Sequence, residues 1–256
     1  METDWIKLRY KVDSFVESEV DLCAPIDLHS IATKMGIVSI EPRQMKFDGY
    51  LARAHTGEGY VVRYKATSPP VRLRFTIAHE IGHLIYAYML GQKLSDPVNR
   101  DADRCNEEER IVNKIAARIL IPEASLVKSL ARLAVKTVDA CVRALGPEFR
   151  VSKQTIAGRL LESPSFVVVA FEVAKCPHTD SIKNLKVRTS EGKRVFFSSP
   201  PSKIAAELVS RRCQPQVVTC EADGAKYRLY LRHSRLFSQN ECMSFWGWVH
   251  VSDQLV

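Results

Sequence analysis

The residues with the clearest chemical potential lie in one segment, residues 74–83, which reads RFTIAHEIGH. His79 and His83 are four residues apart, and this spacing places both imidazoles on one face of a helix. Two imidazoles one turn apart can bind a zinc ion, and Glu80, directly after the first histidine, is placed to act on a water molecule at that ion. The segment therefore has the residue types that a metal-dependent hydrolytic site needs.

The flanking residues predict a mostly apolar helix from Leu73 to Leu90. Two histidines and a glutamate on a buried helix cost free energy unless a metal or hydrogen-bond partners satisfy them. However, H-E-x-x-H fixes only three residues, and it also occurs by chance in helices whose histidines are ordinary hydrogen-bonded residues. A third ligand from another part of the chain is needed to decide between these interpretations.

A second helix is predicted over residues 107–121, and Pro122 ends it. Val112, Ile115 and Ile119 form its buried stripe. Three consecutive glutamates at positions 107–109 stand near its start, where negative charge also stabilises the helix dipole. The spacing alone does not distinguish any one of these glutamates as a metal ligand.

Two further helices are predicted over residues 4–22 and 27–34, and short strands over residues 37–64, most clearly at 59–64. A sheet edge beside a protease cleft commonly receives the substrate backbone as an added strand. In the alternative interpretation the small sheet only covers the helices. The sequence leaves both interpretations open.

Together these segments resemble the ImmA/IrrE family of metallopeptidases. Residues 72–83 match the whole of the family segment R-x-R-F-T-x-A-H-E-x-G-H. Residues 109–122 follow its E-x-x-A-N-x-F-A-A-x-L-L-x-P segment and keep Asn113, with Val112 in place of alanine and Ile115 in place of phenylalanine. With weaker matches at residues 25–36 and 151–160, the resemblance covers residues 24–162. One departure is Ala87, where many members carry another histidine.

The resemblance implies that Glu109, rather than its two neighbours, is the third metal ligand beside His79 and His83. Three protein ligands would leave zinc one open position for water, as in catalytic zinc sites. Glu80 is then the expected catalytic residue, which takes a proton from this water and delivers it to the leaving amine. Zn²⁺ is the expected ion, and Mn²⁺ or Fe²⁺ are alternatives.

The expected fold class is α+β. The resemblance implies a mostly helical, zincin-like metallopeptidase domain with a small β-sheet over residues 1–164, which includes a helical segment at 123–162. A smaller β-rich α+β domain is predicted over residues 165–256, with six strands and one helix at 202–212. In some relatives a C-terminal domain senses a signal or shapes substrate access, so a regulatory role is expected by analogy.

The segment at residues 152–161 is also typical of a helix-turn-helix, with Lys153 and Arg159 expected on an exposed basic face. A direct DNA-binding role would follow from that interpretation. The family resemblance instead places this segment inside the peptidase domain as packing. Direct DNA binding is therefore the less favoured interpretation.

Composition limits the class of protein. The formal net charge is +8, which suits acidic or nucleic-acid partners but equally a solvated surface. The seven cysteines lack C-x-x-C spacing, which favours reduced thiols in a cytoplasmic protein; Cys213 and Cys220 are a candidate redox pair, although buried thiols are the favoured interpretation. Neither a secretory signal nor an apolar run of roughly 20 residues, as a membrane span needs, is present.

The expected function is a cytoplasmic zinc endopeptidase. The resemblance implies that its substrate is a helix-turn-helix transcriptional repressor, whose cleavage derepresses a stress, phage or mobile-element response. Tyr60, Tyr64 and His55 are candidates for stabilising the oxyanion, and the sequence does not choose among them. The alternative is a non-catalytic antirepressor or antitoxin-like binding protein with a structural metal site. Glu80 argues against it, because a structural site has no use for that carboxylate.

Overall fold

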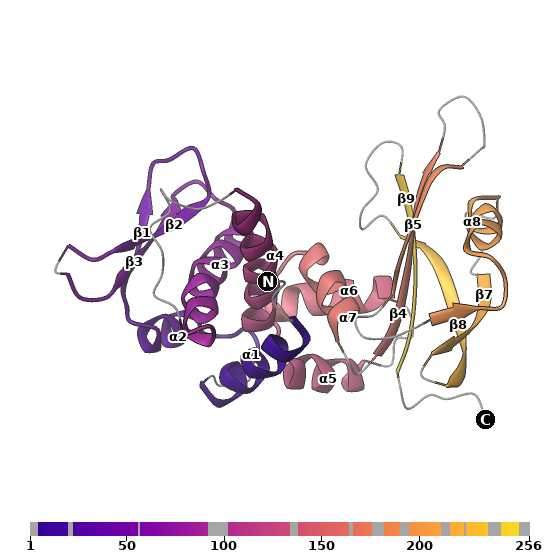
Figure 1. Ribbon diagram of the computed structural model, residues 1–256, viewed down its shortest axis with the longest axis horizontal. Coiled ribbons are helices and arrows are strands. Elements are labelled where there is room, and N and C mark those ends of the chain that lie inside the picture. The colour runs from indigo at the N-terminus through magenta and orange to yellow at the C-terminus, as the bar shows by residue number, and fades with distance from the viewer. Residues whose placement is uncertain are drawn as a thin grey trace. The chain divides into compact units, whose positions relative to one another are not determined.

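The computed structural model describes residues 5–19, 23–55, 57–91, 102–133, 138–163, 166–175, 182–189, 195–210, 216–222, 224–234 and 242–250 of the chain. Contacts between Cα atoms divide the chain into two compact units (Figure 1). The first comprises Met1–Ser129 and Gly146–Ser152, and the second comprises Leu130–Leu145 and Lys153–Val256. The predicted α+β class is confirmed, whereas the domain boundary at residue 164 stays a prediction.

Helices form most of the first unit. It contains α1 (Trp5–Glu19), α2 (Leu28–Lys34), α3 (Pro70–Met89) and α4 (Ala102–Leu120), and α5 (Glu123–Arg132) begins in it. α3 packs along α4 and also contacts α1 and α2. Nine of its residues, including Glu80 and His83, are buried. α3 is therefore the central helix of this unit, and its polar side chains need partners.

Local sequence explains where α3 lies and how closely it is packed. It begins after Pro69 with Pro70 as its first helical residue, where a missing N–H costs nothing. Gly82 permits a close approach to α4, because a Cβ atom there would lie 3.2 Å from both Cγ1 and the carbonyl oxygen of Val112. Apolar residues of α4 are buried at helical spacing, namely Ile111, Val112, Ile115, Ala116 and Ile119.

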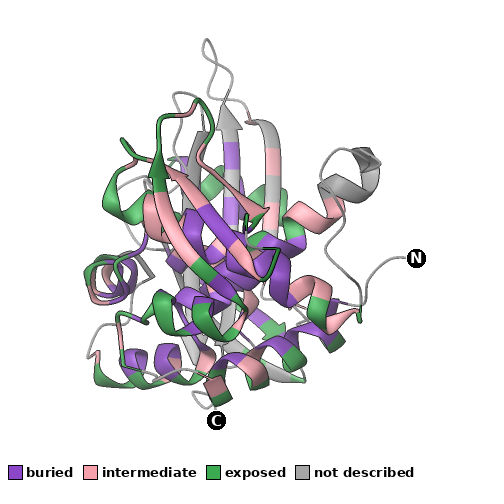
Figure 2. Ribbon diagram, turned by 90° about the vertical axis from the view of Figure 1, so that its left-hand side faces the viewer, coloured by how far each residue is buried: buried purple, intermediate pink, exposed green. Residues whose placement is uncertain are grey.

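A three-stranded sheet completes the first unit. It consists of β1 (Ile37–Arg43), β2 (Gly49–Arg53) and β3 (Tyr60–Lys65), in the order β1-β3-β2. β1 runs parallel to β3, and β2 runs antiparallel to it. The strands are mostly half-buried or exposed, whereas buried residues concentrate in the helices (Figure 2). β2 is therefore an edge strand, and both β2 and β3 contact α3.

The second unit is built on a six-stranded sheet in the order β5-β4-β9-β8-β7-β6. All neighbouring pairs are antiparallel. The strands are β4 (Phe166–Lys175), β5 (Ile182–Thr189), β6 (Val195–Phe197), β7 (Gln216–Ala222), β8 (Ala225–Ser234) and β9 (Cys242–His250). Helix α8 (Pro201–Ser210) packs against β5 and β8. Six strands and one helix agree with the elements predicted for this part of the sequence.

Two helices of the segment at residues 123–162 differ from expectation. α6 (Val138–Phe149) continues through Gly146 and Pro147, two residue types that usually interrupt a helix. The helix ends shortly after Pro147: Arg150 has a positive φ of 52°, its N–H donates to the Pro147 carbonyl, and the Val151 N–H donates to the Gly146 carbonyl. Both bonds together form a Schellman cap.

The expected basic face of this segment is smaller than predicted. In α7 (Lys153–Glu162), Lys153 is exposed, but Arg159 is fully buried, so the prediction for Arg159 is wrong. Arg159 lies three residues after the buried Ile156, which places it on the buried side of the helix. The DNA-binding interpretation therefore loses one of its two named cations.

Among the described helices, none is long and apolar enough to cross a membrane.

Candidate metal centre

α3 presents His79 and His83 one helical turn apart. Their ring centroids are 4.9 Å apart and the rings are nearly perpendicular, at 83°. His83 is buried and His79 is half-buried. The Nε2 atoms of both rings are directed to the same carboxylate on α4.

That carboxylate belongs to Glu109. Its Oε2 lies 3.2 Å from His79 Nε2, and its Oε1 lies 3.5 Å from His83 Nε2. In a tetrahedral zinc site with bonds of about 2.0–2.1 Å, neighbouring ligand atoms are roughly 3.3–3.4 Å apart. The three side chains therefore fit one metal ion with little movement. Within the described part of the chain, they are the only group of three or more His, Cys, Asp and Glu side chains so arranged.

Two further residues of α4 hold the histidine rings. His79 Nδ1 lies 3.0 Å from Asn113 Oδ1, and His83 Nδ1 lies 3.0 Å from Glu108 Oε1. Both oxygens accept, so each Nδ1 carries the proton and each Nε2 keeps its lone pair for a metal. Asn113 matches the family segment noted in the sequence. The role of Glu108 escaped sequence reasoning, because nothing but its position beside Glu109 singles it out.

The electrostatics of the site favour a cation at the point where the Nε2 atoms meet Glu109. Burial lowers the pKa of His79, but its contacts with Glu109, Glu80 and Asn113 outweigh this effect and hold the pKa above its usual value. The same negative groups that favour a proton on this ring favour a metal ion in its place. The donor set of two imidazoles and one carboxylate is also a set that zinc uses.

Glu80 lies outside this group of ligands. It is 6% exposed, and its carboxylate accepts a hydrogen bond from the backbone of Leu51 in β2. Burial raises the pKa of Glu80 above its usual value, although the two histidines and the Leu51 hydrogen bond act in the opposite direction. A buried carboxylate with a raised pKa is suited to exchange protons rather than to serve only as a charge.

β2 lies close to the N-terminal half of α3 on the Glu80 side. A Cβ atom on Gly49 would clash with the Thr76 side chain and would lie 3.6 Å from Glu80 Oε1. Gly49 therefore faces α3, and by strand alternation Leu51 and Arg53 share that face.

The two candidate tyrosines for the oxyanion are cross-strand neighbours of these residues: Tyr64 lies opposite Gly49, and Tyr60 lies opposite Arg53. Both candidate tyrosines for the oxyanion thus lie on the α3-facing side of the sheet.

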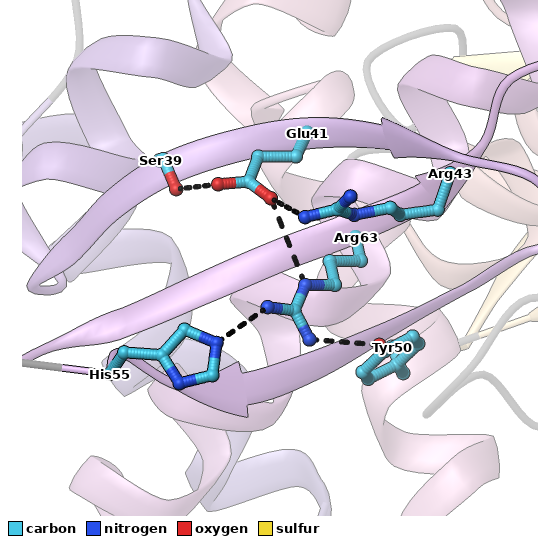
Figure 3. A network of polar contacts seen from close by, with 6 residues as sticks. All are labelled: Ser39, Glu41, Arg43, Tyr50, His55 and Arg63. Carbon is cyan, nitrogen blue, oxygen red and sulfur yellow. Dashed lines mark hydrogen bonds and ion pairs between the residues drawn. The ribbon is translucent and has the colours of Figure 1, made fainter.

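His55, the third oxyanion candidate, belongs to a polar network on the opposite face (Figure 3). Its Nε2 lies 3.5 Å from Arg63 Nη2, and Arg63 Nη1 donates to the Tyr50 hydroxyl at 3.0 Å. Arg63 also faces Glu41 of β1, which in turn binds Arg43. The network ties the three strands together, and it separates His55 from the two tyrosines.

Comparisons with known proteins agree with this geometry. The model of the IrrE N-terminal-like domain, of peptidase family M78, matches residues 32–161. No curated protein matches the sequence significantly. Among solved structures, a Mycobacterium tuberculosis transcriptional regulator is similar over 96% of this chain and 88% of its own, with 12% sequence identity and a TM-score of 0.53. At this identity the likeness concerns the fold alone.

The matched residues cover half of the chain and include α3 and the part of α4 that carries Glu109. The match indicates a metallopeptidase-like function. It also confirms the resemblance observed in the sequence. The chain belongs to the ImmA/IrrE family of M78 peptidases.

Proposed function

We propose that this protein is a zinc-dependent endopeptidase in which His79, His83 and Glu109 hold the ion and Glu80 is the catalytic residue. The supporting observation is that both Nε2 atoms face the Glu109 carboxylate, while the buried Glu80 is not part of this group and accepts from Leu51. When bound there, the ion would polarise the scissile carbonyl and lower the pKa of the attacking water. Mn²⁺ and Fe²⁺ accept the same donor types and remain alternatives.

Glu80 would move the proton in this reaction. As the general base it takes a proton from the attacking water, and as the general acid it delivers this proton to the leaving amine. Its raised pKa, caused by burial, brings the carboxyl closer to the range in which it can do both near neutral pH. The hydrogen bond from Leu51 fixes the direction in which the carboxylate points.

The free edge of β2 would bind the substrate backbone. Asp48 accepts from the Lys65 N–H and Ala54 donates to the Gly59 carbonyl, so even-numbered positions of this strand bond towards β3. The backbone groups of the odd-numbered positions 49, 51 and 53 therefore point away from β3. The Leu51 N–H donates there to Glu80, and the groups of positions 49 and 53 face the edge. An extended peptide that adds a strand there would place its backbone beside Glu80.

The proposed substrate is a helix-turn-helix transcriptional repressor, whose cleavage would derepress a stress, phage or mobile-element response in the cytoplasm. Membership of the ImmA/IrrE family supports this substrate class. A zincin-like catalytic domain at residues 1–164 and a regulatory domain at residues 165–256 complete the proposal. Substrate, regulation and domain roles all rest on the family resemblance rather than on the geometry of the site.

The test is a mass-spectrometric survey of new protein N-termini in host cells. Cells with the wild-type protein are compared with cells carrying Glu80→Ala, with and without stress. A third strain carries Glu107→Gln, which alters a neighbouring carboxylate outside the metal cluster. We expect new termini in the wild type and in Glu107→Gln that fall about 10²–10⁴-fold in Glu80→Ala, the usual contribution of a general acid–base residue.

The survey also separates the proposal from its competitor. If no terminus depends on Glu80 while deletion of the gene still changes transcription, the endopeptidase proposal fails. A non-catalytic antirepressor that binds its partner would then account for the phenotype. Termini that depend on Glu80 would identify the substrate in the same experiment.

A further inference from the structure

Arg53 ends the edge strand that contacts Glu80. Leu51, two residues earlier, donates its backbone hydrogen bond to the Glu80 carboxylate. Two residues in a strand span about 6.6 Å, and their side chains lie on the same face of the sheet. The Arg53 side chain therefore begins about 6.6 Å along β2 from the Glu80 contact, on the α3-facing side of the sheet.

The Arg53 guanidinium is held in place but not neutralised. Its Cζ lies 5.6 Å from the ring centroid of Tyr60, the residue opposite it in β3. The side chain is exposed, and among the described residues no carboxylate pairs with it. A guanidinium that already rests on an aromatic ring loses little further freedom when it binds a carboxylate.

Other arginines of this unit differ in that respect. Arg43 and Arg63 share Glu41, and Arg72 pairs with Asp48. Each of these arginines has a carboxylate within the sheet or the adjoining loop. Arg53 is thus exposed, packs on the Tyr60 ring and can accept an ion-pair partner. It lies two strand residues from the contact between Leu51 and the proposed catalytic residue Glu80.

The position of Arg53 in β2 predicts which residue of a paired substrate it would contact. A peptide along the edge of β2 can pair with the Arg53 backbone, and its residue two positions away then lies beside Leu51, whose N–H is held by Glu80. Directly opposite residues have Cβ atoms about 4.5–5.5 Å apart on the same face, within reach of an ion pair. We propose that Arg53 makes the site select substrates with an aspartate or glutamate two residues from the bond that is cleaved.

This inference rests on the proposed function, because it assigns substrate chemistry to the same site. The test therefore measures binding and cleavage separately. The full chain, loaded with zinc and carrying Glu80→Gln so that peptides are bound but not cut, is used to select from a displayed library of random peptides. Arg53→Glu and Arg53→Gln are compared in the same background, with Arg43→Gln on the opposite sheet face as the matched control.

We expect one position of the selected peptides to be enriched in aspartate and glutamate. Replacing that acid by its amide should weaken binding roughly 10-fold, as expected for loss of a charge-assisted hydrogen bond. Arg53→Gln should remove the enrichment, Arg53→Glu should replace it with lysine and arginine, and Arg43→Gln should leave it unchanged. Because Arg53 is exposed, the variants should keep wild-type zinc content and circular dichroism.

Three outcomes overturn the inference: no peptide is selected, the selected peptides show no acidic preference, or the preference survives Arg53→Glu. Digestion of the selected peptides by the wild-type protein then tests proteolysis independently. Selection that depends on Arg53 without any cleavage would refute the endopeptidase but not the acidic subsite. Cleavage without acidic preference would refute the subsite alone.

Discussion

Two hydrophobic cores of this protein differ in the polar groups that they bury. Around α3 and α4, the buried side chains include Glu80 and His83, each with a hydrogen-bond partner on another element. The interior between the six-stranded sheet and α8 is formed by aliphatic and aromatic residues, including Phe171. Its titratable group is Cys220, whose pKa burial raises to about 11, so the thiol stays neutral.

This difference suggests a chemical role for the first core and a structural role for the second. An unsatisfied buried polar group costs about 1–3 kcal/mol, so a cluster of them is retained only where partners satisfy it or where it has a function. The first interior carries such a cluster and the second does not. Cys220 agrees with the buried thiol favoured from the sequence, while Cys213 lies outside the described residues.

The largest expected effect concerns a proposed metal ligand. His83→Ala removes one of three proposed donors, so we expect the purified protein to lose its stoichiometric metal. His29→Ala, which alters an exposed histidine of α2, is the matched control and should retain the metal. Metal content is measured by inductively coupled plasma mass spectrometry after dialysis. Full occupancy in His83→Ala would mean that the cluster on α3 and α4 is not the metal site.

A substitution in the other interior should change stability instead of metal content. Phe171→Ala deletes a fully buried ring that lies 5.5 Å from the Phe197 ring, and we expect a loss of about 3–5 kcal/mol in the free energy of unfolding. Phe196→Ala, at a position 65% exposed, should cost about 0.5 kcal/mol or less. Both are measured by denaturant unfolding, with metal content determined in parallel.

Metal loss in Phe171→Ala at temperatures where the protein remains folded would contradict the division of roles. The two interiors would then be coupled, and a structural element common to both would have to transmit the effect of the substitution. Unchanged metal content would support a supporting role for the apolar interior.

The parts of the site that lie within one element could be predicted from the sequence. His79, Glu80 and His83 share α3, so helical periodicity alone sets their relative directions. Glu109 required the family resemblance, because periodicity does not select it from three adjacent glutamates. Alternation and turn residues, which are also local signals, predicted β3 and the six strands after residue 165, but only the presence of short strands in the region of β1 and β2.

Contacts between elements could not be predicted in the same way. The bonds from Glu108 to His83 and from Leu51 to Glu80 depend on how α4 and β2 are placed against α3, which periodicity leaves open. Gly49 and Gly82 were the available signals, because a glycine inside a strand or helix often marks a close approach of backbones.

We expect a smaller effect from Glu108 than from the proposed metal ligands. It accepts the His83 Nδ1 proton, and loss of such a partner commonly lowers metal affinity about 10–100-fold. Glu108→Ala should show this loss in a zinc competition titration. Glu108→Gln should recover part of the affinity, because its amide oxygen can still accept. Equal effects of Glu108→Ala and the control Glu107→Gln would argue against a positioning role.

The smallest expected effect comes from a pair of helical glycines, one in each unit. At Gly82 a new methyl would meet Val112 of α4 at 3.2 Å, so packing strain of about 1–3 kcal/mol should outweigh the gain of up to about 1 kcal/mol in helix propensity. At Gly158 in α7 nothing lies within 4 Å of the added atom, so Gly158→Ala should gain stability. Thermal unfolding should therefore move in opposite directions for the two variants. A higher Tm for Gly82→Ala would mean that α4 can yield to the methyl, and that the spacing of Glu109 from the histidines tolerates more adjustment than the close packing implies.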